Sequence, residues 1–343
     1  HIQYTAPYLH SGGGPGGWGS AIVEVPYQLY KHFGEKEVLS EYYGAMRRYI
    51  DYLEAHSEFG LVTSDKKGNW CLGDWCGPNV IYPDKDFTEH NQQMVIPAAY
   101  VNTYFMVKSL EKMCEIAGII GKPEDIEEYK EKINLRKNAI RAAYFNAFDD
   151  NFIMNVQGAN VFGYDIGLGN KNTYNKIVSY YEKIGCLDTG IFATDILSRL
   201  LFENGNGELA VKLLTNDGAQ GFEHWRRNGA TTFHEYWDSN RSRSHSHPMF
   251  GAPVAYFFKY LLGIKQEEGS VSYKSLIIEP QCVTMFERMK GSIETPYGKV
   301  SVSYVNNAES TDFEITIPDG VNAVFKIKEE SFELKNGVNK FTI

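Results

Sequence analysis

The chain has 343 residues, and because a single hydrophobic core stops growing at about 250–300 residues, we expect two domains. Its 34 Lys and Arg residues against 43 Asp and Glu residues give a net charge of -9, which repels phosphate backbones and argues against a nucleic-acid partner. No run of about 18 apolar residues is present, so we expect no membrane partner either.

Apolar residues recur at helical spacing through most of the first 262 residues. In the clearest segment they step by three or four from Leu39 to Leu53, which predicts an amphipathic helix. The same spacing predicts further helices at 20–33, 91–118, 124–146, 159–168, 172–185, 190–203, 207–217 and 248–262, with Gly34, Gly118 and Gly263 just past helix ends.

Long connections separate these helices and carry all five tryptophans. Connections of more than about 12–15 residues in a compact domain are usually functional, so we expect functional residues in them. The connections are residues 11–19 with Trp18, residues 60–90 with Trp70 and Trp75, residues 150–158, and residues 218–247 with Trp225 and Trp237.

After Gly263 the apolar period changes from helical to alternating. Val-, Ile- and Phe-rich runs separated by turn signals predict an antiparallel β-sandwich of about seven short strands. We therefore expect a helical domain over 1–262 and a β-sandwich domain over 263–343. The clearest predicted strands are 275–279, 286–294, 299–305, 312–317 and 323–328.

Cysteine and aromatic content restrict the chemistry further. The five cysteines are scattered without CxxC spacing, so we expect free thiols and no metal site. Aromatic residues make up 14% of the chain, and aromatic faces pack against the C–H faces of sugar rings as well as against one another.

The segment 228–238 places Glu235 beside His234, Tyr236 and Trp237 in a loop before a helix. A glycosidase needs such a carboxylate next to an aromatic wall, because it must activate water or stabilise a cationic sugar centre. The alternative is a solvated surface glutamate. Shortly after, His245 and His247 are placed to donate to sugar hydroxyls or to Glu235, or else to cap the following helix.

Two further segments pair tryptophans with small or acidic residues. Trp18 lies among glycines, where its ring can lie exposed, although packing between loops is the alternative. Asp74 and Trp75 combine a hydrogen-bond acceptor with an aromatic platform, as sugar-binding sites do. Asp74 could instead satisfy the N–H groups of its own turn.

Together these segments resemble the second half of the catalytic region of glycoside hydrolase family 78, the bacterial and fungal α-L-rhamnosidases. The resemblance covers nearly the whole chain. It rests on Pro-Gly-Gly-Trp-Gly-Ser (15–20), Gly-Asp-Trp (73–75), Leu-Asp-Thr-Gly-Ile-Phe-Ala-Thr (187–194), Asn-Gly-Ala-Thr-Thr-Phe-His-Glu-Tyr-Trp-Asp (228–238) and Ser-His-Pro-Met-Phe-Gly-Ala (246–252).

The resemblance implies an (α/α)6 barrel followed by a β-sandwich, and an inverting removal of terminal α-L-rhamnose from glycans or glycosides without a cofactor. It implies that Glu235 is the general base and that Trp18 and Trp75 are walls of the rhamnose pocket. It further implies that His247 hydrogen-bonds the sugar, with His245 in its place if the register slips. Asp74 and Trp237 complete the expected substrate-binding set.

The chain departs from the family pattern at two points. Nine predicted helices are three fewer than the family barrel has, and the Asp-x-x-x-Arg-x-Glu-like segment that holds the family's general acid is not found before Trp18. Since the chain also begins with His1, we expect a fragment whose general acid lies upstream of residue 1. His234 stands where the family usually has Trp. A barrel glycosidase for another sugar and a non-catalytic carbohydrate-binding protein are the alternatives.

Overall fold

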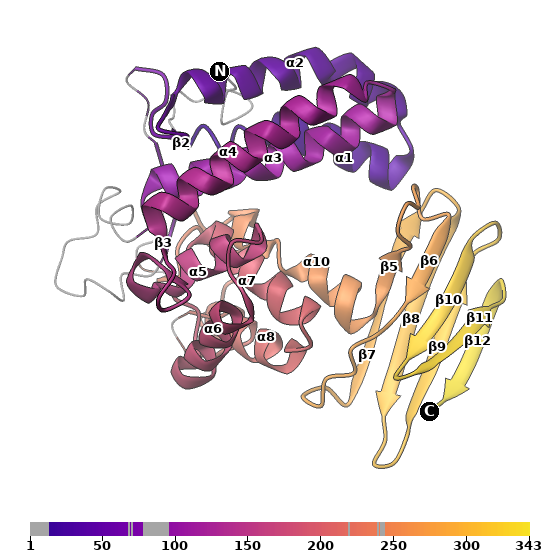
Figure 1. Cartoon of the computed structure of the whole chain (residues 1–343). Coiled ribbons are helices and arrows are strands. Elements are labelled where there is room, and N and C mark those ends of the chain that lie inside the picture. The colour runs from indigo at the N-terminus through magenta and orange to yellow at the C-terminus, as the bar shows by residue number, and fades with distance from the viewer. Residues whose placement is uncertain are drawn as a thin grey trace. The chain divides into compact units, whose positions relative to one another are not determined.

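The structure is a computed structural model that describes residues 14–67, 69, 71–77, 96–218, 220–238, 240 and 244–343 (Figure 1). Trp70 and the predicted helical residues 91–95 lie outside this described part. The chain forms two compact units. Unit 1 comprises His1–Tyr27, Lys36–Leu197 and Leu213–Phe250, and unit 2 comprises Gln28–Glu35, Ser198–Lys212 and Gly251–Ile343.

Eight of the nine predicted helices are confirmed, with displaced ends, and the ninth, over 248–262, is not one continuous helix. The prediction for Gly118 was wrong, because α3 continues past it and ends where Gly121 adopts a left-handed conformation with φ 78. The helices are α1 (Ala21–Phe33), α2 (Lys36–Ala55), α3 (Ala98–Ile120), α4 (Glu124–Tyr144), α5 (Gln157–Asp165), α6 (Lys171–Ile184), α7 (Ile191–Glu203), α8 (Gly207–Leu214), α9 (Phe222–Arg227) and α10 (Val254–Tyr256).

Two segments differ from the sequence prediction. Helix α9 lies inside the predicted connection 218–247, and its six residues are too few to show a helical period. The segment predicted as one helix over 248–262 is a 3-10 turn (Pro248–Gly251), α10 and a π-helical turn (Phe257–Leu261).

Within unit 1, consecutive helices form antiparallel hairpins. Short turns join α3 to α4 at 121–123 and α5 to α6 at 166–170, whereas residues 96–97 before α3 and the connections 145–156 and 185–190 lie at the opposite ends of these helices. In Figure 1, β2 and β3 both lie on the left, at that end of α3 and α4. The connections contain two unpredicted hairpins with two-residue strands, namely β1 (Ser57–Glu58) with β2 (Leu61–Val62) and β3 (Phe145–Asn146) with β4 (Asn151–Phe152).

Helix α3 is the central helix of unit 1, because nearly all of its residues from Tyr100 to Leu110 are buried. Two of its buried polar side chains hydrogen-bond neighbouring elements. Thr103 Oγ1 accepts a hydrogen bond from Val62 N at 2.8 Å, and Tyr100 donates its hydroxyl to the carbonyl of Ala159 at 2.9 Å. These bonds tie α3 to the β1–β2 hairpin and to α5, so the loop-bearing end of unit 1 is held by α3.

The turn between β4 and α5 is backbone-strained and anchored by buried amides. Ile153, Met154 and Asn155 all have positive φ, a conformation that costs a residue with a Cβ about 1–2 kcal/mol. Asn160, at the first turns of α5, accepts from Phe152 N at 2.7 Å and donates to Asn155 Oδ1 at 2.9 Å. The buried amide thus stabilises the strained turn.

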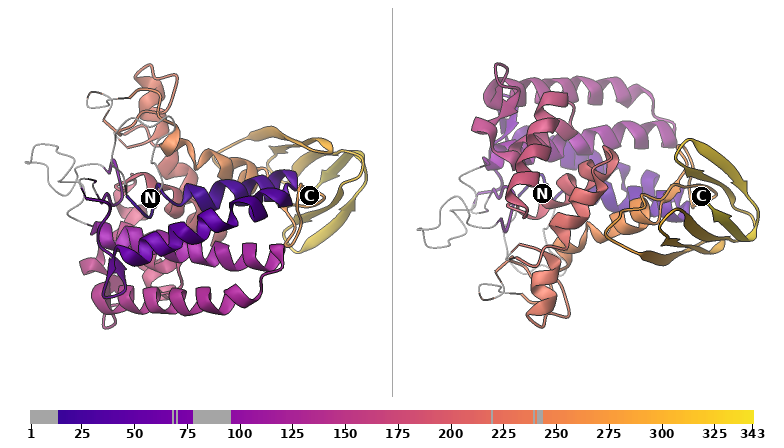
Figure 2. Two further views of the ribbon diagram at one scale, coloured as in Figure 1. Left: turned by 90° about the horizontal axis from the view of Figure 1, so that it is seen from above. Right: turned by 90° about the horizontal axis from the view of Figure 1, so that it is seen from below.

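The strands of unit 2 form two four-stranded sheets, which Figure 2 shows from above and below. Strand order is β11-β10-β6-β5 in one sheet and β12-β9-β8-β7 in the other. The prediction of a fully antiparallel arrangement was wrong at one pair, because β10 runs parallel to β6. The strands are β5 (Ile264–Gln266), β6 (Ser275–Ile278), β7 (Arg288–Thr295), β8 (Gly298–Asn306), β9 (Thr311–Ile317), β10 (Asn322–Ile327), β11 (Glu330–Leu334) and β12 (Gly337–Thr342).

Alternation along these strands builds the core of unit 2. In β8, Val300, Val302 and Tyr304 are buried while the residues between them are more exposed, as one buried face requires. Phe313 of β9 and Phe325 of β10 pack against each other within this core, with ring centroids 5.0 Å apart and ring planes tilted by 57°. The short strands β5, β11 and β12, which the sequence prediction did not resolve, complete the two sheets.

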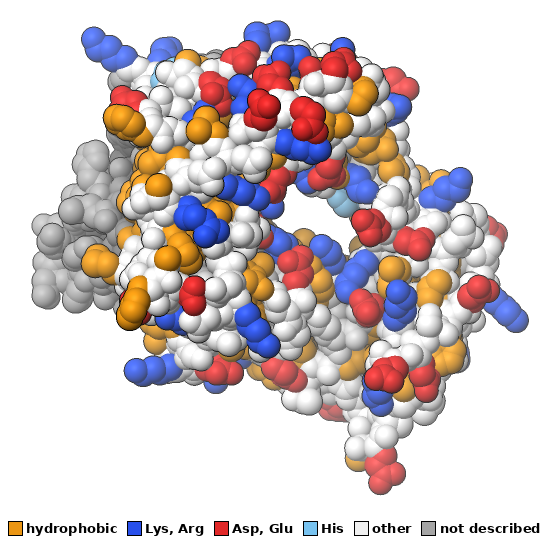
Figure 3. Space-filling view, viewed as in Figure 1, with side chains coloured by type: hydrophobic (Ala, Val, Ile, Leu, Met, Phe, Trp, Pro, Cys, Tyr) orange, Lys and Arg blue, Asp and Glu red, His pale blue; other side chains and the backbone are white. Residues whose placement is uncertain are grey.

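Charged side chains of both signs are interspersed over α2, α3 and α4, in the upper part of Figure 3. They form ion pairs between helices, such as Arg47 with Asp125 at 3.0 Å and Lys137 with Glu111 at 3.0 Å. Among the described residues, no helix combines the length and the apolar character that crossing a membrane demands.

Candidate active site

The glycine-rich turn that carries Trp18 is held by the buried amide of Asn102 and by the Tyr49 hydroxyl, which lies 2.9 and 3.0 Å from the carbonyl oxygens of Pro15 and Gly16. Asn102, 0% exposed, accepts a hydrogen bond from Gly16 N at 2.9 Å and donates to the carbonyl of Leu72 at 3.0 Å. A Cβ at Gly16 would lie 2.5 Å from the Asn102 carbonyl, so a glycine is required there. The half-buried ring of Trp18 meets the Phe192 ring edge-on, with centroids 5.0 Å apart.

Asp74 and Trp75 bind the N-terminal end of α7. The first N–H groups of a helix have no acceptor within the helix, and here the Asp74–Trp75 dipeptide supplies one to each of four consecutive groups. The bonds are Gly190 N to Asp74 Oδ2 at 2.8 Å, Ile191 N to the Trp75 carbonyl at 2.8 Å, Phe192 N to Asp74 Oδ1 at 3.0 Å and Ala193 N to Asp74 Oδ1 at 3.1 Å.

Burial dominates the ionisation of Asp74, which is 8% exposed. It raises the pKa of Asp74 to about 6, against the opposing effect of the three backbone N–H donors, and nearby Asp188 raises it further. The sequence left open whether Asp74 binds a sugar or caps its own turn. The structure shows it bound to a turn 116 residues later in the chain, and a direct contact with a sugar stays a prediction.

Glu235 lies half-buried where two segments pair in antiparallel fashion. Its N–H donates to the carbonyl of Ser244 at 2.9 Å, and the N–H of His247 donates to the carbonyl of Phe233 at 2.8 Å. The hydroxyl of Thr232 also donates to the carbonyl of His245. This pairing brings both candidate histidines of the sequence prediction to the segment that carries the candidate base.

The histidines of this pairing differ in their surroundings. His234 is 6% exposed and stacks on the exposed ring of His245 at 4.3 Å; burial, and then the neighbouring His245, lower the pKa of His234. The Nδ1 atom of half-buried His247 is itself buried and makes no hydrogen bond with any described residue. An unsatisfied buried nitrogen is costly, which is consistent with a site for a polar ligand.

Trp237 is placed in the core of unit 1. It is 2% exposed, its indole N–H donates to the carbonyl of Thr189 at 3.2 Å, and its carbonyl accepts from the indole N–H of Trp225 at 3.0 Å. The rings of Trp225 and Phe250 lie 4.9 and 4.2 Å from it. Trp237 therefore packs in this core, and a contact of its ring with a sugar stays a prediction.

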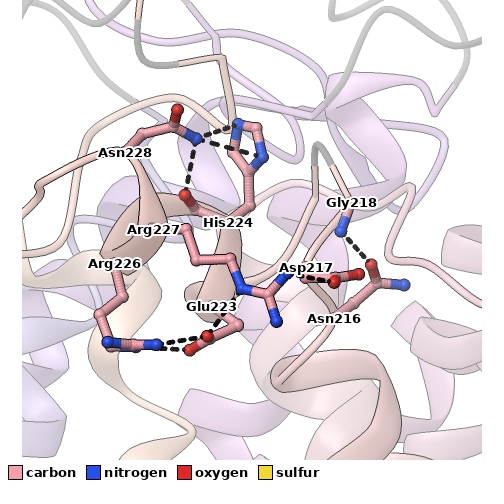
Figure 4. A network of polar contacts seen from close by, with 8 residues as sticks. All are labelled: Asn216, Asp217, Gly218, Glu223, His224, Arg226, Arg227 and Asn228. Atoms are coloured by element: carbon pink, nitrogen blue, oxygen red, sulfur yellow. Dashed lines mark hydrogen bonds and ion pairs between the residues drawn. The ribbon is translucent and has the colours of Figure 1, made fainter.

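Helix α9 carries Trp225, whose ring stacks on that of Trp237 in the segment that holds Glu235. On its exposed side, Glu223 pairs with Arg226 at 2.6 Å and with Arg227 at 3.0 Å, as Figure 4 shows. These hydrogen bonds, with Arg226 first, lower the pKa of Glu223 to about 2. The helix ends where Gly229 takes φ 84, and the chain then turns into the Glu235 segment.

Three connections that are distant in sequence therefore meet at the start of α7. Trp18 contacts Phe192, the Asp74–Trp75 dipeptide holds the first turn, and Trp237 bonds to Thr189. The ring of Trp75 lies 6.4 Å from that of Tyr236, which follows Glu235 directly. The shared start of α7 brings the predicted residues together. Within the described part of the chain, no group of three His, Cys, Asp or Glu side chains could hold a metal ion.

Sequence reasoning missed the residues that organise this region. Phe192 and Thr189 lie in the 187–194 motif, which was a usable signal, but Asn102 lies inside a helix where nothing distinguishes it from a solvated residue. Trp225 was counted only as a loop tryptophan.

Helical hairpins that gather a half-buried carboxylate and aromatic rings at one end, followed by a β-rich domain, define a six-hairpin glycosidase fold. The family described as the bacterial alpha-L-rhamnosidase 6 hairpin glycosidase domain matches residues 2–261, and the bacterial alpha-L-rhamnosidase C-terminal domain matches residues 263–342. The chain belongs to this bacterial alpha-L-rhamnosidase family.

Curated relatives carry the same description. An alpha-L-rhamnosidase of Alteromonas sp. (strain LOR) is 26% identical over 325 residues, which cover 90% of this chain and 34% of the relative. One from Formosa agariphila is 25% identical over 361 residues, covering 99% of this chain and 37% of the relative. The chain thus spans about a third of the length of these relatives.

Solved structures share the fold. The crystal structure of Streptomyces avermitilis alpha-L-rhamnosidase complexed with L-rhamnose aligns with a TM-score of 0.80 at 22% identity, covering 96% of this chain and 33% of that one. The alpha-L-rhamnosidase of Aspergillus terreus aligns with a TM-score of 0.84 at 18% identity, covering 100% and 41%.

Proposed function

We propose that the protein acts as a glycoside hydrolase that removes terminal α-L-rhamnose from glycans or glycosides. Family membership supports this activity, and so do the relatives, which are named alpha-L-rhamnosidases. The observation that carries the proposal is the half-buried Glu235, held by backbone pairing and followed directly by Tyr236, whose ring lies 6.4 Å from that of Trp75.

The proposed roles follow from chemistry. Glu235 deprotonates the water that attacks the anomeric carbon, and Trp18 and Trp75 supply aromatic walls for the sugar ring. His247 hydrogen-bonds a sugar hydroxyl, which the buried, unsatisfied Nδ1 atom supports. His245, whose exposed ring stacks on that of His234, is the alternative sugar donor.

We propose an inverting reaction, in which base and acid stand on opposite faces of the sugar, about 6.5–9.5 Å apart, with room for water between them. We place the general acid outside these 343 residues. No cofactor takes part in this scheme. We also propose that the catalytic domain comprises residues 1–262 and the β-sandwich domain residues 263–343.

The first test measures sugar binding by calorimetry on the 343-residue chain, with L-rhamnose and D-glucose side by side. We expect L-rhamnose to bind and D-glucose not to bind. Preference for D-glucose would replace the proposal with a barrel glycosidase for another sugar.

The second test measures hydrolysis of an aryl α-L-rhamnoside by the chain and by a longer parent protein. We expect Glu235→Gln to lower the parent's turnover by about 10²–10⁴-fold, the usual range for losing a general base. The matched control is Glu111→Gln, a carboxylate that pairs with Lys137 on the surface of α3. A parent that binds rhamnose but hydrolyses nothing would be a carbohydrate-binding protein.

A further inference from the structure

The start of α7 is held from outside the helix by an arrangement that leaves no N–H group of its first turn unsatisfied. The first N–H to bond within the chain's own helix is that of Thr194, which donates to the carbonyl of Gly190 at 2.9 Å. The four N–H groups before it all donate to Asp74 or Trp75. Helices usually satisfy the N–H groups of their first turn with a nearby side chain or with water. In α7, two residues that are distant in the sequence supply the acceptors for all four groups.

The contact depends on a close approach of two backbones. A Cβ at Gly190 would lie 2.3 Å from the carbonyl oxygen of Trp75 and 2.7 Å from Asp74 Oδ1. No side chain fits there without moving the Asp74–Trp75 segment away from α7. Gly190 is therefore a second, independent determinant of the same contact.

Both tryptophan walls of the proposed pocket, Trp18 and Trp75, depend on where the first turn of α7 lies. Phe192, whose N–H is held by Asp74, packs against Trp18 at 5.0 Å and against Phe105 at 4.5 Å. Trp75, whose carbonyl is part of the contact, faces Tyr236 beside the proposed base. A shift of the turn would move both tryptophan walls.

We infer that Asp74 and the Trp75 carbonyl form a clamp on the first turn of α7, and that Asp74 is a positioning residue that sets the ring positions of Trp18 and Trp75. This rests on the proposed function, because the rings matter for a sugar pocket. Asp74 thus acts through Phe192 and Trp75 and does not need to touch the sugar.

The test compares Asp74→Ala, Asp74→Asn and Gly190→Ala with Asp165→Ala. Asp165, the last residue of α5, is a matched control because it is also a buried aspartate. Its side chain is 4% exposed and accepts a hydrogen bond from the Tyr104 hydroxyl at 2.6 Å. Amide hydrogen exchange measures whether Asp74 and Trp75 still hold the N–H groups of the first turn of α7. We expect the amides of 190–193 to exchange about tenfold or more faster in Asp74→Ala and Gly190→Ala, less so in Asp74→Asn, which keeps one acceptor oxygen, and unchanged in the control.

The positions of the Trp18 and Trp75 rings are measured in the absence of sugar, by fluorine NMR of protein labelled with 5-fluorotryptophan. We expect the resonances of Trp18 and Trp75, assigned by single Trp→Phe changes, to shift in the clamp variants and not in Asp165→Ala. L-rhamnose affinity should fall by about tenfold or more in Asp74→Ala, with partial recovery in Asp74→Asn.

The outcomes separate this inference from the proposed function. Wild-type exchange rates at 190–193 in Asp74→Ala would overturn the clamp. Faster exchange with unchanged Trp18 and Trp75 resonances would overturn the positioning role. If the wild-type chain binds no L-rhamnose, the proposed function fails while exchange and fluorine resonances still decide the inference. If Asp74→Ala does not fold, Asp74→Asn and Gly190→Ala give the same decision.

Discussion

Replacing Asn102 with alanine should test how the Trp18 turn is held. The Asn102 side chain is fully buried, and it donates to the carbonyls of Leu72 and Ala98 at 3.0 and 2.8 Å and accepts from Gly16 N at 2.9 Å. The Ala98 carbonyl keeps its helical partner in α3, but Gly16 N–H and the Leu72 carbonyl lose theirs. Each buried group left unsatisfied costs about 1–3 kcal/mol, so we expect a loss of about 4 kcal/mol.

Urea unfolding followed by tryptophan fluorescence measures this loss. A cost of about 4 kcal/mol is a large fraction of the 5–15 kcal/mol typical of a folded domain, so the midpoint should fall clearly. The control is Asn307→Ala, an exposed amide that donates to Asp312 at 2.9 Å and should cost no more than about 0.5 kcal/mol. A loss below about 1 kcal/mol for Asn102→Ala would refute the reasoning, because the turn would then be held by other contacts.

Three further outcomes are expected. Because burial raises the pKa of Asp74 to about 6, above the value of 3.8 for the unfolded chain, its contribution to stability is full below about pH 3.8 and is lost as pH rises through 6. The unfolding free energy of wild type relative to Asp74→Asn should therefore drop by about 2–3 kcal/mol between pH 4 and pH 7, and a rise would contradict this. Met154 has φ 52 and is 92% exposed, and asparagine adopts this left-handed conformation more readily than methionine. Met154→Asn should therefore raise the thermal midpoint through a gain of about 0.5–1 kcal/mol in unfolding free energy. A lower midpoint would mean that the Met154 thioether makes a stabilising contact. Trp225→Phe leaves the Trp237 carbonyl without its partner at 3.0 Å and should cost about 1–3 kcal/mol in urea unfolding, with an unchanged midpoint as the contrary result.

Local periodicity was sufficient to predict most elements. The three- and four-residue steps from Leu39 to Leu53 predicted α2, because a helix that buries one face must repeat its apolar residues at that spacing. Alternation predicted β8 in the same way, and the end of the helical pattern at Gly263 coincides with a positive φ of 72 at that residue. Each of these features depends only on residues that are close to one another in the sequence.

The short elements escaped prediction for the same reason. Helix α9 has six residues, and its position is decided by Trp225 packing on Trp237, not by its own pattern. The parallel pairing of β10 with β6 joins segments more than 40 residues apart, and alternation within a strand does not specify its neighbour or its direction.

The candidate site was predicted by residue type and motif, but the roles of its members depend on distant partners. Glu235, Trp18 and Trp75 could be named from their sequence surroundings. Asp74 was predicted to bind the sugar or, as the alternative, to satisfy N–H groups of its own turn. Its carboxylate instead accepts from N–H groups 116 residues away, because the start of a helix needs acceptors that a distant part of the chain can supply. Trp237 looked like a platform for a sugar and is buried, because only the assembled core decides which aromatic ring faces solvent.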